Sequence, residues 1–343
     1  MTIVSRGLCG LALFMLPLAS SAQSRKYYFD QTYLPASHNW EFRSSFPQAD
    51  RLFNAFDYGH AILYETLWRQ PDAKRDVLDT DEFGFITTRL LVRPPKVMLD
   101  ETAIGPEWAK LAPEVVMIFE WAHMLHRQIY DIWADDRIKP ADKDPKVAEV
   151  LKYYKTRPAL ALSSKPKDMD LMEGQSYSLA FRQRFPKYNG LIWSYHWLQM
   201  TLYDALMAGG TKPERVANVA AVVDQFRKMT FAPETLPSVM PMSPAIAPAF
   251  SARYPEAAIM FDNLHSLHDV VSDILANPKV ARGAKRRTIL EAASRYRDDR
   301  TSVTSVAEWL DMSESMGVEK MGGRPAFTVK AAADTSKATK PHH

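Results

Sequence analysis

Residues 113–135 read PEVVMIFEWAHMLHRQIYDIWAD, and residues 255–277 read PEAAIMFDNLHSLHDVVSDILAN. Aligned without a gap, nine of the 23 positions are identical. Both segments begin with PE, continue with F-[E/D]-x-x-H-x-L-H and end with D-I-x-A-[D/N]. An internal repeat of this kind indicates that the fold is assembled from related units.

A second pair of similar segments lies upstream of the first pair. Residues 42–67 and 181–206 match at eight of 26 positions, and both end in L-Y-[E/D]-x-L. The carboxylates of that closing motif are Glu65 and Asp204. The two pairs together predict a tandem duplication that covers about 42–135 and 181–277. Each copy is expected to hold one helix ending in a carboxylate, a connection, and a helix with [E/D]-x-x-H-x-x-H.

The N-terminus resembles a secretory signal peptide. Arg6 precedes the apolar residues 8–18, and small residues follow up to Ala22, where we expect cleavage. The only cysteine, Cys9, would be removed with residues 1–22. The mature chain would then hold metals through histidines and carboxylates alone. We therefore expect a periplasmic or secreted protein.

Composition and charge narrow the classes of protein to which the chain could belong. The 343 residues are 46% hydrophobic, enough for a sizeable core, and we expect one helical domain over residues 23–321. The formal net charge of +3 does not favour a nucleic-acid partner, and no later segment predicts a permanent membrane span. Residues 322–343 are polar and predict a disordered tail. The sequence leaves the oligomeric state open.

Hydrophobic periodicity predicts an all-α fold. The four bundle helices are expected at about 48–69, 113–136, 187–208 and 254–276, and shorter helices near 145–155, 174–184, 213–230, 283–297 and 302–314. Residues 71–112 are interpreted as a long connection with a short strand at 86–92. Residues 138–172 and 233–248 are interpreted mainly as loops, and the aromatic segment 23–41 as an irregular arm.

The repeated histidines lie on helices that are apolar nearly all round. Glu120, His123 and His126 fall within an arc of about 120° at 100° per residue. Such a helix belongs in the core, where a carboxylate and two imidazoles need partners. Asp262, His265 and His268 on the other helix need partners for the same reason. A metal bound between the two helices would satisfy both sets, and a buried hydrogen-bond network is the alternative.

This arrangement resembles the ferritin-like di-iron carboxylate four-helix bundles, which consist of two related helix pairs. The resemblance covers the four bundle helices, about half of the chain. It implies a dinuclear centre, with iron as the expected metal and manganese, copper or zinc as alternatives. The ligands it implies are Glu65, Glu120, His123, Asp204, Asp262 and His265.

Several residues depart from that pattern. His126 and His268 are extra to the usual motif, and His60 and His196 break the register of the duplication. All four are candidates for additional ligands or for groups that orient the ligands. An all-histidine alternative places His60, His123 and His126 around one copper ion, and His196, His265 and His268 around another.

Two aspartates, each five residues beyond a repeated histidine, and two tyrosines also repeat. Asp131 and Asp273 are expected to orient neighbouring groups or to cap a helix. Tyr64 and Tyr203 adjoin the carboxylates of the closing motif and are interpreted as packing residues rather than redox groups.

Two functions follow from these patterns. The first is a metal-dependent oxidoreductase acting on O2, peroxide or a small organic substrate, with unassigned catalytic residues. The second is a metal-binding or metal-delivery protein without turnover, in which His60, His196 and the Met240–Met242 pair form a transfer route. Imidazole-rich sites suit copper and zinc, whereas mixed carboxylate sites suit iron and manganese.

Overall fold

The structure is a computed structural model that describes residues 33–98 and 100–327. The segment interpreted as a signal peptide and residues 328–343 of the predicted tail lie outside these residues. The described chain is helical, as predicted, and its β-pairing is confined to an isolated bridge between Lys167 and Val303.

Four long helices form the core. They are α3 (Pro47–Arg69), α7 (Pro113–Ala134), α11 (Pro186–Ala208) and α15 (Pro255–Ala276). Their ends agree with the predicted helices to within two residues. Every residue from 118 to 134 in α7 and from 257 to 276 in α15 is buried, because these sequences are apolar around most of the helix.

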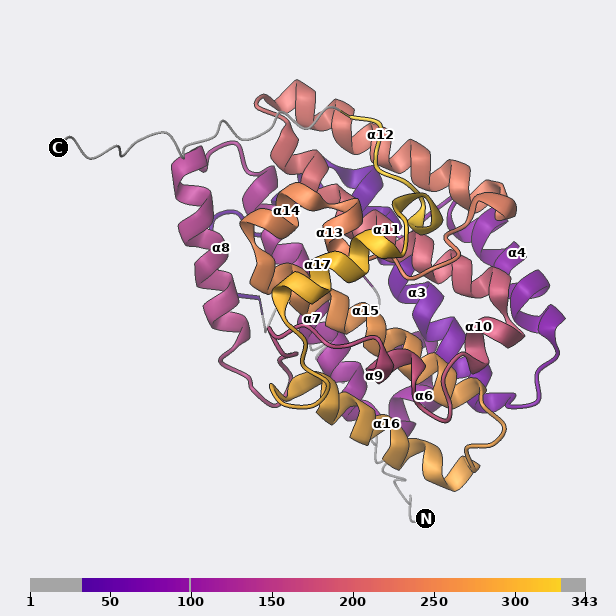
Figure 1. Ribbon diagram of the computed structural model, residues 1–343. Helices are drawn as coiled ribbons and strands as arrows, with labels where there is room; N and C mark the ends of the chain where they lie inside the picture. The colour runs from indigo at the N-terminus through magenta and orange to yellow at the C-terminus, as the bar shows by residue number, and fades with distance from the viewer. Residues whose placement is uncertain (1–32, 99, 328–343) are drawn as a thin grey trace, which may run out of the picture. The chain divides into compact units, whose positions relative to one another are not determined.

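The four long helices pack against one another (Figure 1). α3 lies close to α11 and α15, and α7 lies close to the same two helices. Buried hydroxyls join them: Tyr64 donates to the backbone carbonyl of His268, and Tyr130 donates to that of Gln199. The centre of the structure is therefore a single shared interior.

Other helices cover this interior from outside (Figure 1). α8 (Pro140–Tyr154) packs on α7, α12 (Lys212–Phe231) on α11, and α16 (Arg282–Arg297) on α15, while α17 (Val306–Ser315) packs on the short α13 (Ser243–Ile246). None of the described helices combines the length and apolar character that a bilayer crossing requires.

A short helix leads into each long one through a sharp bend. These lead-in helices are α2 (Glu41–Ser45), α6 (Pro106–Leu111), α10 (Ala180–Arg184) and α14 (Pro248–Arg253). The residue at each bend precedes a proline and leaves the helical region, with φ between −140° and −130° and ψ between 58° and 61°. Proline disfavours the helical conformation at the residue before it and is well tolerated in a first turn, so the same local chemistry produces all four bends.

The lead-in helices of the first helix pair are capped by carboxylates from that pair. Asp131 of α7 accepts hydrogen bonds from the backbone N–H groups of Trp40 and Phe42 at the start of α2, both at 2.8 Å. Glu65 of α3 accepts from Glu107 and Trp108 at the start of α6, both at 2.9 Å. Each carboxylate satisfies amides that have no partner within the helix.

The second pair makes the same contacts. Asp273 of α15 accepts from Leu179 and Phe181 at the start of α10, at 2.9 and 2.7 Å. Asp204 of α11 accepts from Ala249 and Phe250 at the start of α14, at 3.0 and 2.7 Å. In both pairs, each long helix holds the lead-in helix of the other.

The segments interpreted as connections contain more helix than predicted. The strand prediction at 86–92 is wrong: the chain there continues through η1 (Val77–Glu82), α4 (Phe83–Phe85) and η2 (Ile86–Leu90), where η1 and η2 are π-helical turns. Buried Ile86 and Leu90 lie four residues apart, a helical spacing that short apolar runs conceal. Further short helices are α5 (Glu101–Ile104), α9 (Asp170–Glu173), η3 (Pro233–Thr235) and η4 (Val318–Met321).

Replacing the capping aspartates tests their structural role. Asp131→Ala and Asp273→Ala each leave buried amides without acceptors, so we expect each to lower the free energy of unfolding by roughly 1–3 kcal/mol. Urea denaturation measures this loss. Glu149→Ala, at an exposed position of α8, is the control and should change stability little. If Asp131→Ala and Asp273→Ala have the same free energy of unfolding as the wild type and the Glu149→Ala control, the caps are dispensable.

Candidate metal centre

Six of the seven histidines in the described residues gather where the four long helices meet. We call this group the six-histidine cluster: His60 on α3, His123 and His126 on α7, His196 on α11, and His265 and His268 on α15. None exposes more than 3% of its surface. Successive rings are adjacent, with centroid distances of 4.2 Å for His60–His268 and 4.0 Å for His196–His265.

Three of these side chains already converge. His60, His196 and His268 each offer a ring nitrogen, and the three nitrogens lie within 4.8 Å of one another. The residues come from three different helices, so the packing of α3, α11 and α15 determines their geometry. This buried group could hold a metal ion. It takes one histidine from the first set of the all-histidine alternative and two from the second, so that grouping is not the one observed.

The other three histidines are each held by a polar neighbour. The Tyr203 hydroxyl lies 2.7 Å from Nδ1 of His126, and the Gln199 side-chain oxygen lies 3.1 Å from Nε2 of His265. An Asp57 carboxylate oxygen lies 3.7 Å from Nδ1 of His123, a polar contact longer than a hydrogen bond. A histidine anchored through one nitrogen presents the other in a fixed direction, which is the arrangement metal ligands commonly have.

The nitrogens that face inward lack partners. Both ring nitrogens of His60, His196 and His268 make no hydrogen bond, and neither do Nε2 of His123 and His126 nor Nδ1 of His265. Buried polar atoms are normally satisfied, and an unsatisfied one costs roughly 1–3 kcal/mol. Unpaired nitrogens on the converging rings are available to a metal ion, which the group of His60, His196 and His268 could hold.

Aromatic rings surround the cluster. The Phe56 ring lies 4.2 Å from that of His60 and 5.2 Å from that of His123, and Phe119 lies 4.2 Å from His268. Phe261 stacks on His126 at 3.5 Å. These apolar walls exclude water, and burial accordingly lowers the pKa of His60 and that of His265 to about 3. The imidazoles are neutral at neutral pH, the form that binds metals.

Two of the predicted carboxylate ligands lie outside this group. The Glu65 and Asp204 carboxylates accept the backbone hydrogen bonds that cap α6 and α14. Neither belongs to the converging trio of His60, His196 and His268. The repeated carboxylate of the closing motif is thus explained by helix capping, and its role as a ligand stays a prediction.

The other two carboxylates differ from each other. Asp262 accepts hydrogen bonds from the Ser243 hydroxyl at 2.6 Å and from the Trp309 indole at 2.8 Å. Glu120 instead lies near Glu101, and both are buried. Burial raises the pKa of Glu120 to about 8, and burial together with the Glu120 charge raises the pKa of Glu101. Both oxygens of Glu101 lack partners.

Sequence patterns did not reveal the groups that orient the histidines. Asp57 aligns with His196 in the repeat, and Gln199 aligns with His60. Each half therefore has one histidine of the trio and one polar partner at the same two positions, but in opposite order. The signal that could have found Asp57 and Gln199 was this exchange of residue types at aligned positions.

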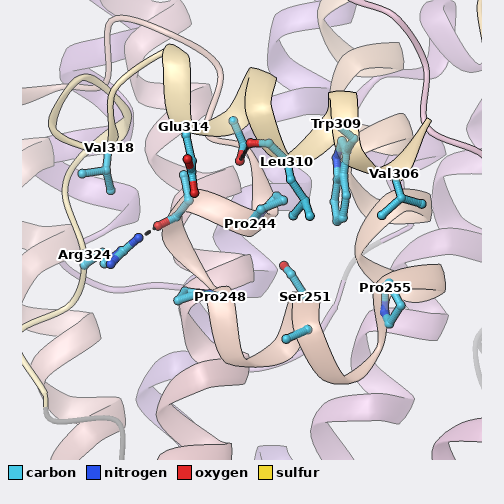
Figure 2. Close-up of a pocket in the computed structure, with 13 residues that line it drawn as sticks. Pro244, Pro248, Ser251, Pro255, Val306, Trp309, Leu310, Glu314, Val318 and Arg324 are labelled. Atoms are coloured by element: carbon cyan, nitrogen blue, oxygen red, sulfur yellow. Dashed lines mark hydrogen bonds between the residues drawn. The ribbon is translucent and has the colours of Figure 1, made fainter. Parts of the chain in front are cut away.

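A separate hollow is lined by residues of the last third of the chain. It has a volume of about 580 Å³ and is lined by α13, α14, α17 and neighbouring residues, including Trp309, Glu314 and Arg324 (Figure 2). Arg324 donates from Nε to the backbone carbonyl of Ala245 at 3.0 Å. The lining of this hollow holds no histidine. The six-histidine cluster has side chains that can bind a metal, so the cluster is the stronger candidate for the functional site.

Comparison with known proteins adds no family. No protein-family model, curated protein sequence or solved structure matches the chain. The function must therefore be argued from the chain's own residues.

The lowered histidine pKa values predict how the metal-free protein responds to acid. The His60 ring takes up a proton below about pH 6.5 in the unfolded chain but only below about pH 3 in the folded chain. The unfolded state therefore binds more protons between these values, and the histidine contribution to stability is lost as the pH falls through that window.

His60→Leu removes one such group. In chelator-treated protein, we expect the slope of unfolding free energy against pH, between pH 4 and 6, to decrease by about 1.4 kcal/mol per pH unit. Urea denaturation at a series of pH values measures it. Phe56→Leu, which alters packing at the neighbouring ring without removing a titrating group, should leave the slope unchanged. A slope unaffected by His60→Leu would contradict a buried neutral imidazole.

Proposed function

We propose that this protein is a metal-binding protein whose six-histidine cluster holds a transition-metal centre. The observation that carries the proposal is the convergence of His60, His196 and His268, three buried imidazoles from three helices with unpaired ring nitrogens. A bound cation would accept a lone pair from each ring and offset the cost of burying it. When bound, such a metal would supply Lewis acidity and, if it is redox-active, an electron-transfer site.

We extend the proposal to a second ion at the three anchored histidines, which do not yet converge as the trio does in the described residues. His123, His126 and His265 each have one nitrogen directed by an outer neighbour and one nitrogen unpaired. Like the ring nitrogens of the trio, these three nitrogens are buried and have no hydrogen-bond partner. We propose a dinuclear centre with three histidines assigned to each metal position.

The donor set favours copper. All six side chains are imidazoles, and nitrogen-rich sites suit copper and zinc better than iron or manganese. The iron expectation depended on the four carboxylates Glu65, Glu120, Asp204 and Asp262, of which Glu65 and Asp204 cap helices. We therefore propose copper as the metal, with zinc as its principal competitor.

The proposal includes the origin of the site. Matching bends and matching caps in the two helix pairs support a duplicated ancestor, and a ferritin-like bundle is the architecture that we propose for the four long helices. The signal-peptide-like N-terminus supports export to a compartment where a thiol-free copper protein is chemically suited to oxidising conditions.

Metal content of variants tests the site. We expect His268→Ala to lose the metal bound by the trio, because one of three ligands is removed. Glu65→Gln should retain it, since the amide oxygen can still cap α6. Protein loaded separately with zinc and copper, desalted and measured by elemental analysis, gives both values. Circular dichroism checks that each variant is folded. Retention of full metal content by His268→Ala would overturn the histidine site, and loss from Glu65→Gln would restore the carboxylate site.

Oxidoreductase activity on O2 is a second candidate function. The observation that favours it is the apolar wall of Phe56, Phe119 and Phe261 against the histidine rings, which suits a small uncharged molecule better than a charged one. Redox-active metal within that wall would meet O2 without bulk water.

Oxygen uptake separates the two functions. If the centre turns over, copper-loaded wild-type protein should consume O2 steadily with an added reductant, and His268→Ala should lose at least about 90% of that rate. An oxygen electrode measures both, with Glu65→Gln as the matched variant that keeps the metal. Uptake that stops after a single equivalent would leave the protein as a metal carrier without turnover.

A further inference from the structure

A second cluster of metal-binding side chains lies on another face of α15. A small cavity of about 10 Å³ is lined by eleven residues, and four of them are methionines. They are Met169, Met240, Met242 and Met312. With 16 methionines among 343 residues, a cavity of this size would contain fewer than one on average. We call this cavity the methionine pocket.

The four methionines come from three separate parts of the chain. Met169 immediately precedes α9, Met240 and Met242 lie in the segment before α13, and Met312 lies on α17. Met240 and Met242 expose 1% and 2% of their surfaces, whereas Met169 and Met312 are partly exposed. Two buried and two partly exposed methionines thus line the same pocket.

The polar lining of the pocket includes a buried carboxylate, while the ammonium of Lys167 is engaged by the backbone carbonyls of Asp298 and Thr301. Asp262 and Ser266 of α15 and the Trp309 side chain belong to the same lining. The Ser266 hydroxyl lies 3.4 Å from the sulfur of Met240. Asp262 is held in place by the Trp309 indole and the Ser243 hydroxyl, so its carboxylate is available as a fixed nearby countercharge. Asp262, which the resemblance to di-iron bundles implied as a ligand of the dinuclear centre, thus lines this second pocket.

The pocket and the six-histidine cluster lie on different sides of one helix. Ile259, Asp262 and Ser266 form a stripe at helical spacing and line the pocket. His265 is rotated from Ser266 by about 100° around the axis of α15. The two sites are therefore neighbours that do not share a ligand.

We propose that the methionine pocket is a binding site for Cu(I). Thioether sulfur is a soft, uncharged donor that selects Cu(I) and leaves zinc and harder cations to nitrogen and oxygen ligands. Methionine also serves as a flexible filler of apolar cores, but a filler needs no countercharge beside it, and Met169 and Met312 of this lining are partly exposed. Binding involves no redox step, because the metal enters and remains as Cu(I). The site is independent of the proposed histidine centre.

Replacement of methionine by leucine tests the pocket while conserving side-chain volume. Wild-type protein and the double variant Met240→Leu/Met242→Leu are loaded with Cu(I) under ascorbate in the absence of oxygen. We expect the double variant to bind about one equivalent less Cu(I) per chain and to lose copper–sulfur scattering in X-ray absorption spectra. Met260→Leu, a buried methionine of α15 outside the pocket lining, is the control and should retain both signals.

A milder variant covers the case in which the double variant does not fold. Met312→Leu alters a partly exposed residue of α17, and we expect it to weaken Cu(I) binding at least about tenfold in competition with a chromogenic Cu(I) chelator. His268→Ala should keep the copper–sulfur signal, so failure of the histidine centre and failure of the methionine pocket are distinguishable. Absence of copper–sulfur scattering in the wild type, or equal Cu(I) affinity for Met312→Leu and wild type, would overturn the proposal.

Discussion

The structure depends on one constraint: six polar imidazole rings lie close together in an interior that is mostly apolar and aromatic. Water would satisfy their nitrogens on a surface, but here the rings of Phe56 and Phe119 lie in its place. Outer neighbours satisfy a few nitrogens, and most have no partner in the polypeptide. An apolar replacement at any of the six positions would remove that cost, which is the physical reason for our proposal that the rings bind a metal.

Helix capping provides the frame that positions these rings. The carboxylates of Asp131 and Glu65 fix the starts of α2 and α6, and those of Asp273 and Asp204 do the same in the second helix pair. Because each lead-in helix joins its long helix through a pre-proline bend, fixing the short element also fixes the direction of the long one. The convergence of His60, His196 and His268 is thus a consequence of charges placed near the helix ends.

Long periodic segments allowed the four core helices to be predicted from sequence, since their apolar residues recur at helical spacing over more than twenty residues. The segment 86–92 could not be assigned in this way, because a run that short satisfies strand and helix patterns equally. Four histidines of the site were identified from the repeat, and His60 and His196 from their departure from it. Their grouping was not predicted, because it depends on how α3, α11 and α15 pack. Glu65 and Asp204 show a further limit: a buried carboxylate at a repeated position can bind a metal or cap a helix, and only the position of the backbone amides distinguishes the two.

The reciprocal caps also determine the order in which the chain can fold. The Asp131 caps join residues 91 and 89 positions apart, and the Asp273 caps join residues 94 and 92 positions apart, so both sets of caps close within one helix pair. The trio, in contrast, takes His60 from the first pair and His196 and His268 from the second. Contacts of lower sequence separation form at a smaller entropic cost, so each pair can close before the two associate. The three histidines would then converge only in the last step, when the halves dock, and an ion bound by them would act on the assembly of the core rather than on a finished site.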